Sequence, residues 1–64
     1  MEHLTKAETL VYNILLKGKL DKEIADHLSI SLNTVKKHNK SIYRKLKVRN
    51  RLEAILVHQQ NSSI

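Results

Sequence analysis

The sequence has no cysteine and no proline, and its 64 residues include one glycine and two aromatic residues, both tyrosine. A chain without cysteine has neither a disulfide framework nor a thiolate metal site, so a reducing cytosol suits it. The scarcity of glycine, proline and aromatic residues disfavours strands joined by tight turns and favours short helices. The longest apolar run, Ala54 to Val57, is far too short to cross a bilayer.

Acidic residues are also scarce, because six Asp and Glu stand against twelve Lys and Arg and give a formal net charge of +6. A basic surplus on a small domain indicates a polyanionic partner, with nucleic acid first and an anionic membrane second. The opening MEHLTKAE has neither a basic nor an apolar signal-peptide region, so we expect no signal peptide.

Start and stop signals predict a compact all-α domain of four helices. Thr5 and Glu8 have the spacing of a capping box, and Gly18 stands where a left-handed residue ends a helix. The predicted helices span residues 6–17, 21–28, 32–46 and 51–60, within one domain of residues 1–61 and a frayed tail of residues 62–64. The later helices begin at similar signals: Asp21, Ser31, and the pair Asn50 and Glu53.

Apolar residues at helical spacing predict the core. They are Ala7, Leu10, Val11, Ile14 and Leu15 in the first helix, Ile24, Ala25 and Leu28 in the second, and Val35, Ile42 and Leu46 in the third.

The third predicted helix carries a cationic face opposite its apolar stripe. At about 100° per residue, Lys36, Lys37, Lys40 and Arg44 fall within an arc of roughly 100° on the side away from the stripe. Lys45 lies outside this arc, and we expect it to be a solvated residue. A short helix, a tight connection and an outward-facing basic helix form a helix-turn-helix, whose second helix enters the DNA major groove. A solvated charged face would explain the same lysines without a partner.

The fourth predicted helix has two apolar faces. Ala54, Ile55 and His58 form one face that packs on the core, while Leu52 and Leu56 lie on another. An exposed leucine pair on so small a domain indicates a partner helix and a symmetric dimer. The alternative is that the leucines fill a groove between the first and fourth helices.

No residue pattern supports catalysis or metal binding. The sequence contains no nucleophile–base pair and no carboxylate pair, so we expect no enzyme and no cofactor. Four histidines occur without ligand spacing. His38 lies beside the apolar stripe, where a partly buried imidazole bonded to a backbone carbonyl is the better interpretation.

Three motifs carry a resemblance to a known family: KEIA at 22–25, IS-x-x-TVK-x-H at 30–38 and KL-x-V-x-NR at 45–51. On these motifs the chain resembles the LuxR/GerE-type DNA-binding domain of NarL/FixJ-type bacterial response regulators and of free-standing regulators. The resemblance covers essentially the whole chain without gaps. It leaves open whether the chain is a complete small regulator or the effector domain of a longer one.

The resemblance implies a role for each matching position. Lys36, Lys37 and Lys40 match positions that meet base edges and backbone in the major groove. The fourth helix, with Leu52, Leu56 and Gln59, matches the dimerisation helix. Contacts to the DNA backbone are implied for Lys22, Ser31, Asn33 and Thr34, and Arg44 shares the lysine arc and reaches toward a phosphate. Lys22 could instead pair with Asp26, and Ser31 also serves as a helix cap.

Three positions depart from the family pattern. Ala7 stands where Arg is frequent, and Lys47 stands where Gly is common. Leu20 replaces a small polar residue, so Asp21 is expected to take over the capping of the second helix.

The sequence therefore predicts a cytoplasmic, nucleoid-associated bacterial regulator that binds double-stranded DNA. We expect a homodimer that is weak alone and closes on DNA, that recruits or blocks RNA polymerase, and that does not bind membranes. A protein-interaction module using the apolar face of the fourth helix is the alternative, with the basic face incidental. RNA binding is disfavoured because only Tyr12 and Tyr43 could stack on bases.

Overall fold

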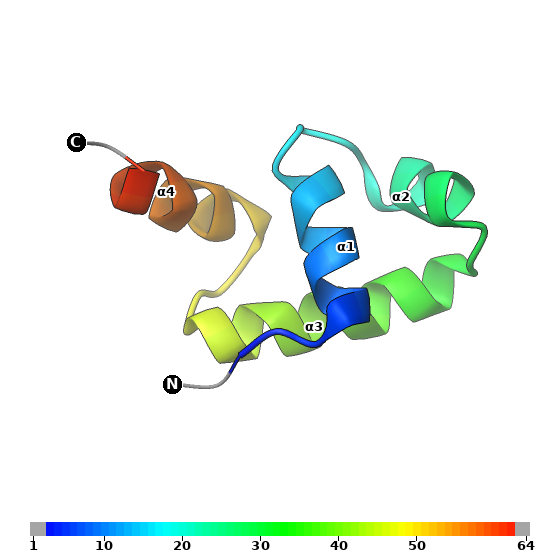
Figure 1. Cartoon of the computed structure of the whole chain (residues 1–64), viewed down its shortest axis with the longest axis horizontal. Coiled ribbons are helices and arrows are strands. Elements are labelled where there is room, and N and C mark those ends of the chain that lie inside the picture. Colours follow the sequence, from blue (N-terminus) through cyan, green and yellow to red (C-terminus); the bar gives the residue numbers. More distant parts are fainter. Residues whose placement is uncertain (1–2, 63–64) are drawn as a thin grey trace.

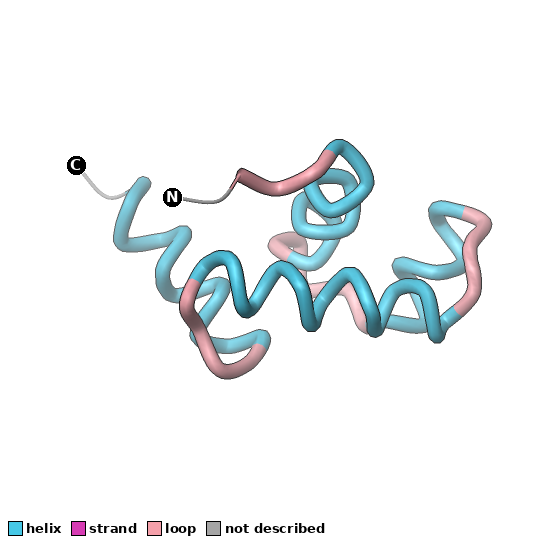
Figure 2. The backbone as a smooth tube through the Cα atoms, turned by 90° about the horizontal axis from the view of Figure 1, so that it is seen from below, coloured by secondary structure: helices cyan, strands magenta, loops and turns pink. Residues whose placement is uncertain are grey.

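Four helices and their connecting loops make up residues 3–62, the part of the chain that this computed structural model describes. They are α1 (Lys6–Leu15), α2 (Asp21–Leu28), α3 (Leu32–Leu46) and α4 (Arg51–Ser62), arranged as shown in Figure 1. Residues 3–62 contain no strand (Figure 2), so the predicted all-α class is confirmed.

The predicted helix starts are confirmed by their capping hydrogen bonds. At α1, Thr5 N donates to Glu8 Oε1 at 2.8 Å and Glu8 N donates to Thr5 Oγ1 at 3.1 Å, which completes the capping box. Ser31 Oγ accepts from Thr34 N at 3.0 Å at the start of α3. At α4, the Asn50 side chain accepts from Glu53 N at 2.9 Å.

The first helix ends two residues earlier than its sequence predicts. Beyond Leu15 the hydrogen bonds tighten to i→i+3 spacing, with Lys17 N donating to the Ile14 carbonyl and Gly18 N to the Leu15 carbonyl. Gly18 then takes the expected left-handed conformation, with φ of +85°. At the other end of the chain, α4 runs to Ser62, two residues beyond its predicted end, and residues 63–64 lie outside the described part.

The expectation that Asp21 caps α2 is wrong. Leu20 occupies the N-cap, where its side chain makes no capping bond, and Glu23 Oε1 instead accepts from Leu20 N at 2.8 Å. Because Glu23 supplies half of a capping box on its own, the Asp21 carboxylate is free to bond elsewhere.

Helices α2 and α3 both end in a Schellman motif without glycine. Ser29 and Lys47 adopt left-handed φ values of 56° and 59°, and the next N–H in each case reaches back to the carbonyl five residues earlier. The first of these motifs makes the turn of the helix-turn-helix, where Ile30 N donates to the Ala25 carbonyl at 3.0 Å.

The core lies where α1 and α2 pack on α3. Its fully buried side chains are Val11, Leu15, Ile24, Val35 and Ile42. Ala7 and Leu10 were expected in this core but are exposed, because the buried arc of α1 is centred on Val11 and Leu15 and takes in Glu8 instead.

Helix α3 is the element against which α1 and α2 pack. In Figure 1 it runs along the lower edge while α1 crosses it and α2 and α4 lie toward opposite ends. Seen from below in Figure 2, α3 passes across the front with no other helix over it. One long side of α3 is therefore left open by the fold.

Helix α4 joins the rest through a narrow contact. Ala54 is fully buried, Ile55 packs against the core, and the Tyr12 hydroxyl donates to the Ala54 carbonyl at 3.4 Å. The exposed His58 ring meets Tyr12 edge-on at 6.2 Å between centroids. The predicted core face of α4 is confirmed for Ala54 and Ile55, whereas His58, which was expected on the same face, is exposed. Burial raises the pKa of Tyr12 above its usual value.

Candidate nucleic-acid interface

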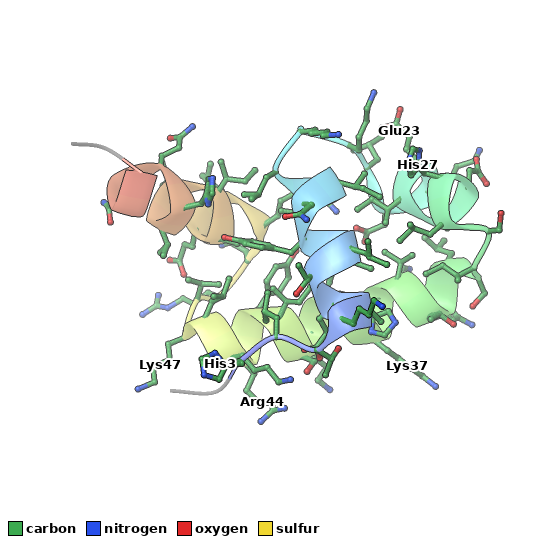
Figure 3. The ribbon with its side chains drawn as sticks, in the orientation of Figure 1. His3, Glu23, His27, Lys37, Arg44 and Lys47 are labelled. Atoms are coloured by element: carbon green, nitrogen blue, oxygen red, sulfur yellow. The ribbon has the colours of Figure 1, made fainter. Side chains whose placement is uncertain are left out.

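The open side of α3 is cationic, as its sequence predicts. Its side chains Lys36, Lys37, Lys40 and Arg44, here called the basic face, are all exposed, while Val35 and Ile42 behind them are fully buried. Lys37 and Arg44 extend from the lower edge of α3, away from α2, in Figure 3. The core therefore fixes which side of α3 faces outward.

The lysines of the basic face have no internal counterion in the described part of the chain, where Lys36, Lys37 and Lys40 make no hydrogen bond and no ion pair. Four carboxylates are held elsewhere: Glu8 pairs with Lys45, Asp21 pairs with Arg51, and Glu23 and Glu53 accept backbone N–H bonds. In Figure 3, Glu23 lies on the far side of the molecule from Lys37. The charge of these three lysines is thus left for an external anion.

The start of α3 adds neutral donors beside the lysines. The Ser31 and Thr34 hydroxyls lie 2.8 Å apart, and Ser31 also accepts from Thr34 N, so the expected capping role is confirmed. Asn33 is exposed between them. Hydroxyl and amide groups at a helix N-terminus suit a phosphate, which the helix dipole also favours.

Lys22 lies on the first turn of α2, with its side chain exposed. Within the described residues it does not pair with Asp26, the alternative that its spacing allows. Lys22 therefore remains available to an anion, and it follows Asp21, which contacts Asn39 in the middle of α3.

The expectation that Lys45 is solvated is wrong. Lys45 Nζ lies 2.7 Å from Glu8 Oε1, and the two side chains are only 12% and 7% exposed. This hydrogen bond, together with those from Ser41 and Thr5, lowers the pKa of Glu8 from 4.5 to about 2. The pair joins α1 to α3 on the side opposite the basic face.

A second polar contact, which sequence reasoning missed, joins α2, α3 and α4. Asn39 is 4% exposed, and its Nδ2 donates to Asp21 Oδ1 at 2.7 Å. Arg51 donates to the same Asp21 oxygen and, at 2.6 Å, to the Lys19 carbonyl. A signal was present, since Asn39 falls at about −60° on the helical wheel, next to the apolar stripe.

His38 is half-buried, as expected, but no described carbonyl accepts a hydrogen bond from it. Among residues 3–62, no three His, Asp or Glu side chains gather as a metal site would require. No described helix has the length and apolar character needed to span a membrane.

The outer side of α4 is apolar and uncovered. Leu52 and Leu56 are 64% and 45% exposed, and Gln59 beside them is exposed as well. The two leucines therefore do not fill a groove between α1 and α4, and the surface they form is free to meet another molecule.

A short helix, a left-handed turn and an outward basic helix held by a three-helix core define a helix-turn-helix domain. The chain belongs to the luxR family of bacterial regulatory proteins, whose family model matches residues 2–58. The resemblance seen in the motifs is thereby confirmed. The chain is accordingly a DNA-binding regulatory domain and not an enzyme.

Several characterised relatives support this assignment. The chain is 42% identical over 53 residues to the spore germination protein GerE of Bacillus subtilis. The matched residues make up 83% of the chain and 72% of GerE. It is 45% identical over 56 residues to the glycerol metabolism activator of Pseudomonas putida, covering 88% of the chain. The transcriptional regulatory protein DesR of Bacillus subtilis is 46% identical over 52 residues, or 81% of the chain. The chain spans only about a quarter of the length of the last two, at 25% and 26%.

Proposed function

We propose that the chain binds specific sites in double-stranded DNA and regulates transcription, with α3 as the recognition helix in the major groove. The observation that carries this proposal is the basic face, which is exposed, lacks counterions for its three lysines and is held from behind by buried Val35 and Ile42. Lys36, Lys37 and Lys40 meet base edges and phosphates, and Arg44 reaches a phosphate farther along the groove.

Backbone contacts flank these lysines. Ser31, Asn33 and Thr34 hold a phosphate at the start of α3, and Lys22 holds another from α2. Because lysine is a point cation without the planar fork of arginine, this surface gives much affinity and modest discrimination between bases.

The domain acts as a homodimer through Leu52, Leu56 and Gln59 of α4. The exposure of both leucines supports this surface, and because only this small surface is offered, the dimer is weak alone and closes on DNA. The bound dimer recruits or blocks RNA polymerase in the bacterial cytoplasm, at the nucleoid.

Selection of bound sequences from random duplex DNA tests the proposal, because it gives the site, its symmetry and its spacing together. If each protomer neutralises roughly 4–6 phosphates, log K for the dimer falls with log[salt] at a slope of about −7 to −11. An affinity independent of salt would contradict the mechanism. Absence of binding to any duplex at low salt would favour a protein-interaction module built on the leucines of α4.

A further inference from the structure

One carboxylate oxygen connects three helices. Asp21 Oδ1 accepts from Asn39 Nδ2 of α3 at 2.7 Å and also from the Arg51 guanidinium of α4. Arg51 donates a further bond, at 2.6 Å, to the Lys19 carbonyl in the loop before α2. Contacts this far apart in the sequence constrain how α2, α3 and α4 sit against one another.

The residues next to these contacts face DNA under the proposed function. Lys22 follows Asp21 along α2, and Lys40 follows Asn39 along α3. On α4, Leu52 of the proposed dimer surface follows Arg51. The Asp21 contacts thus link the three helices that carry the proposed dimer surface and the proposed duplex contacts.

Asn39 is held in one orientation. Its Nδ2 faces the Asp21 carboxylate, and its Oδ1 is buried without a hydrogen-bond partner in the described residues. A buried, unpaired amide oxygen costs stability, so an apolar residue would serve better if this position only filled space. What the asparagine adds is a directional bond that fixes the register of α3 against α2.

We propose that Asp21 is a positioning residue for DNA binding. Because its Oδ1 bonds to both α3 and α4, the distance between Lys22 and the basic face depends on where α4 lies. The inference rests on the proposed function. Loss of the Arg51 contact removes no lysine and leaves the core intact, but the distance between Lys22 and the basic face is no longer fixed. Binding to a selected site therefore weakens more than binding to random DNA.

Arg51→Gln tests this against the matched control Arg49→Gln, which removes the same charge from an exposed side chain at the same junction. Dissociation constants are measured for a duplex selected by the wild-type chain and for a random duplex of equal length. We expect Arg51→Gln to lower the ratio of selected to random affinity about tenfold, and Arg49→Gln to change it less than about twofold. Circular dichroism at the same temperature shows that both variants are folded.

Asp21→Asn provides a second test that keeps an acceptor and the size of the side chain. Removing a negative charge strengthens binding to random duplex, while the weaker bonds to Arg51 and Asn39 lower the preference for the selected duplex. If Asp21→Asn strengthens binding to both duplexes equally, or if the two arginine variants behave alike, the positioning role is refuted. If the wild-type chain itself does not select a duplex, the proposed function fails instead.

Discussion

Lys40 and Lys45 lie on the same helix and carry the same charge, but their surroundings differ. Lys40 is exposed on the basic face, whereas the Lys45 side chain is largely buried, with its Nζ 2.7 Å from a carboxylate of α1. The role of a lysine on α3 is thus set by the side of the helix that it occupies. Each step along the helix rotates the side-chain direction by about 100°, so nearby lysines can face different surroundings.

Replacing each lysine by alanine separates the two roles. Under the proposed function Lys40→Ala removes a DNA contact, so we expect weaker duplex binding and a free energy of unfolding within about 0.5 kcal/mol of wild type. Lys45→Ala leaves the buried Glu8 carboxylate unpaired, which destabilises the fold by about 3 kcal/mol. Urea denaturation and duplex titration measure both effects. If Lys40→Ala unfolds the domain, α3 faces the other way.

The pH dependence of stability reports on Glu8. Its pKa in the folded chain, about 2, lies below the 4.5 of an unperturbed carboxyl, because Lys45, Ser41 and Thr5 hydrogen-bond its charged form. A lowered carboxyl pKa stabilises the fold at every pH above 4.5, and this stabilisation is lost as the pH falls from 4.5 toward 2.

Glu8→Gln removes this dependence. We expect the variant to be less stable than wild type by about 2 kcal/mol at neutral pH, because it loses charged hydrogen bonds to Lys45 and Ser41. The gap narrows steadily as the pH falls from 4.5 to 2 in chemical denaturation curves. A gap that stays constant to the lowest pH would show that the Glu8 charge contributes nothing.

At the scale of elements, the sequence predicted local features of the helices better than it predicted contacts between distant residues. Residues within one or two turns of one another were enough to predict several features. These are the bounds of α2 and α3, the caps of α1, α3 and α4, and the apolar stripe of α3. The bonds of Glu8 to Lys45 and of Asp21 to Arg51 join residues far apart in the chain, and spacing along one helix carries no information about them. Of the candidate site, the exposure of the basic face was predicted, whereas the contacts that orient it were not.

The end of α3 shows how a left-handed turn forms without the glycine that is common at this position of the family. Lys47 stands where glycine is common in the luxR family, and it takes a left-handed φ of 59°. A left-handed conformation costs a non-glycine residue about 1–2 kcal/mol, and the Schellman bond from Val48 N to the Tyr43 carbonyl, at 2.9 Å, holds Lys47 there.

Lys47→Gly relieves this strain. Because glycine also loses more chain entropy on folding, we expect a net gain of about 0.5–1 kcal/mol in the free energy of unfolding. Thermal denaturation measures it.

Gly18→Ala is the opposite control. A Cβ at Gly18 meets nothing within 4 Å, so its φ of +85° alone makes the variant less stable. Equal midpoints for Lys47→Gly and wild type would show that the turn at Lys47 carries no strain.

On the scale of the whole molecule, the chain offers one exposed basic face and one exposed apolar surface. The longest dimension is 34 Å, with α4 toward one end of α3 and α2 toward the other (Figure 1). Successive major-groove faces of B-DNA repeat every 34–36 Å or so. In the proposed dimer, two copies joined through α4 place their basic faces on neighbouring turns of one duplex only if those faces are separated by about this repeat.

Leu56→Arg tests that arrangement, because it places a charge in the proposed interface without touching the core. Its control is Leu10→Arg on α1, a leucine that is 50% exposed against 45% for Leu56 and gains the same charge. In titrations of a two-site duplex, we expect Leu56→Arg to abolish cooperative binding while keeping single-site affinity, and Leu10→Arg to keep both. Both variants gain the same positive charge, so a loss of cooperativity in Leu56→Arg alone reports on contact between protomers. If cooperativity survives Leu56→Arg, a surface other than α4 joins the two copies.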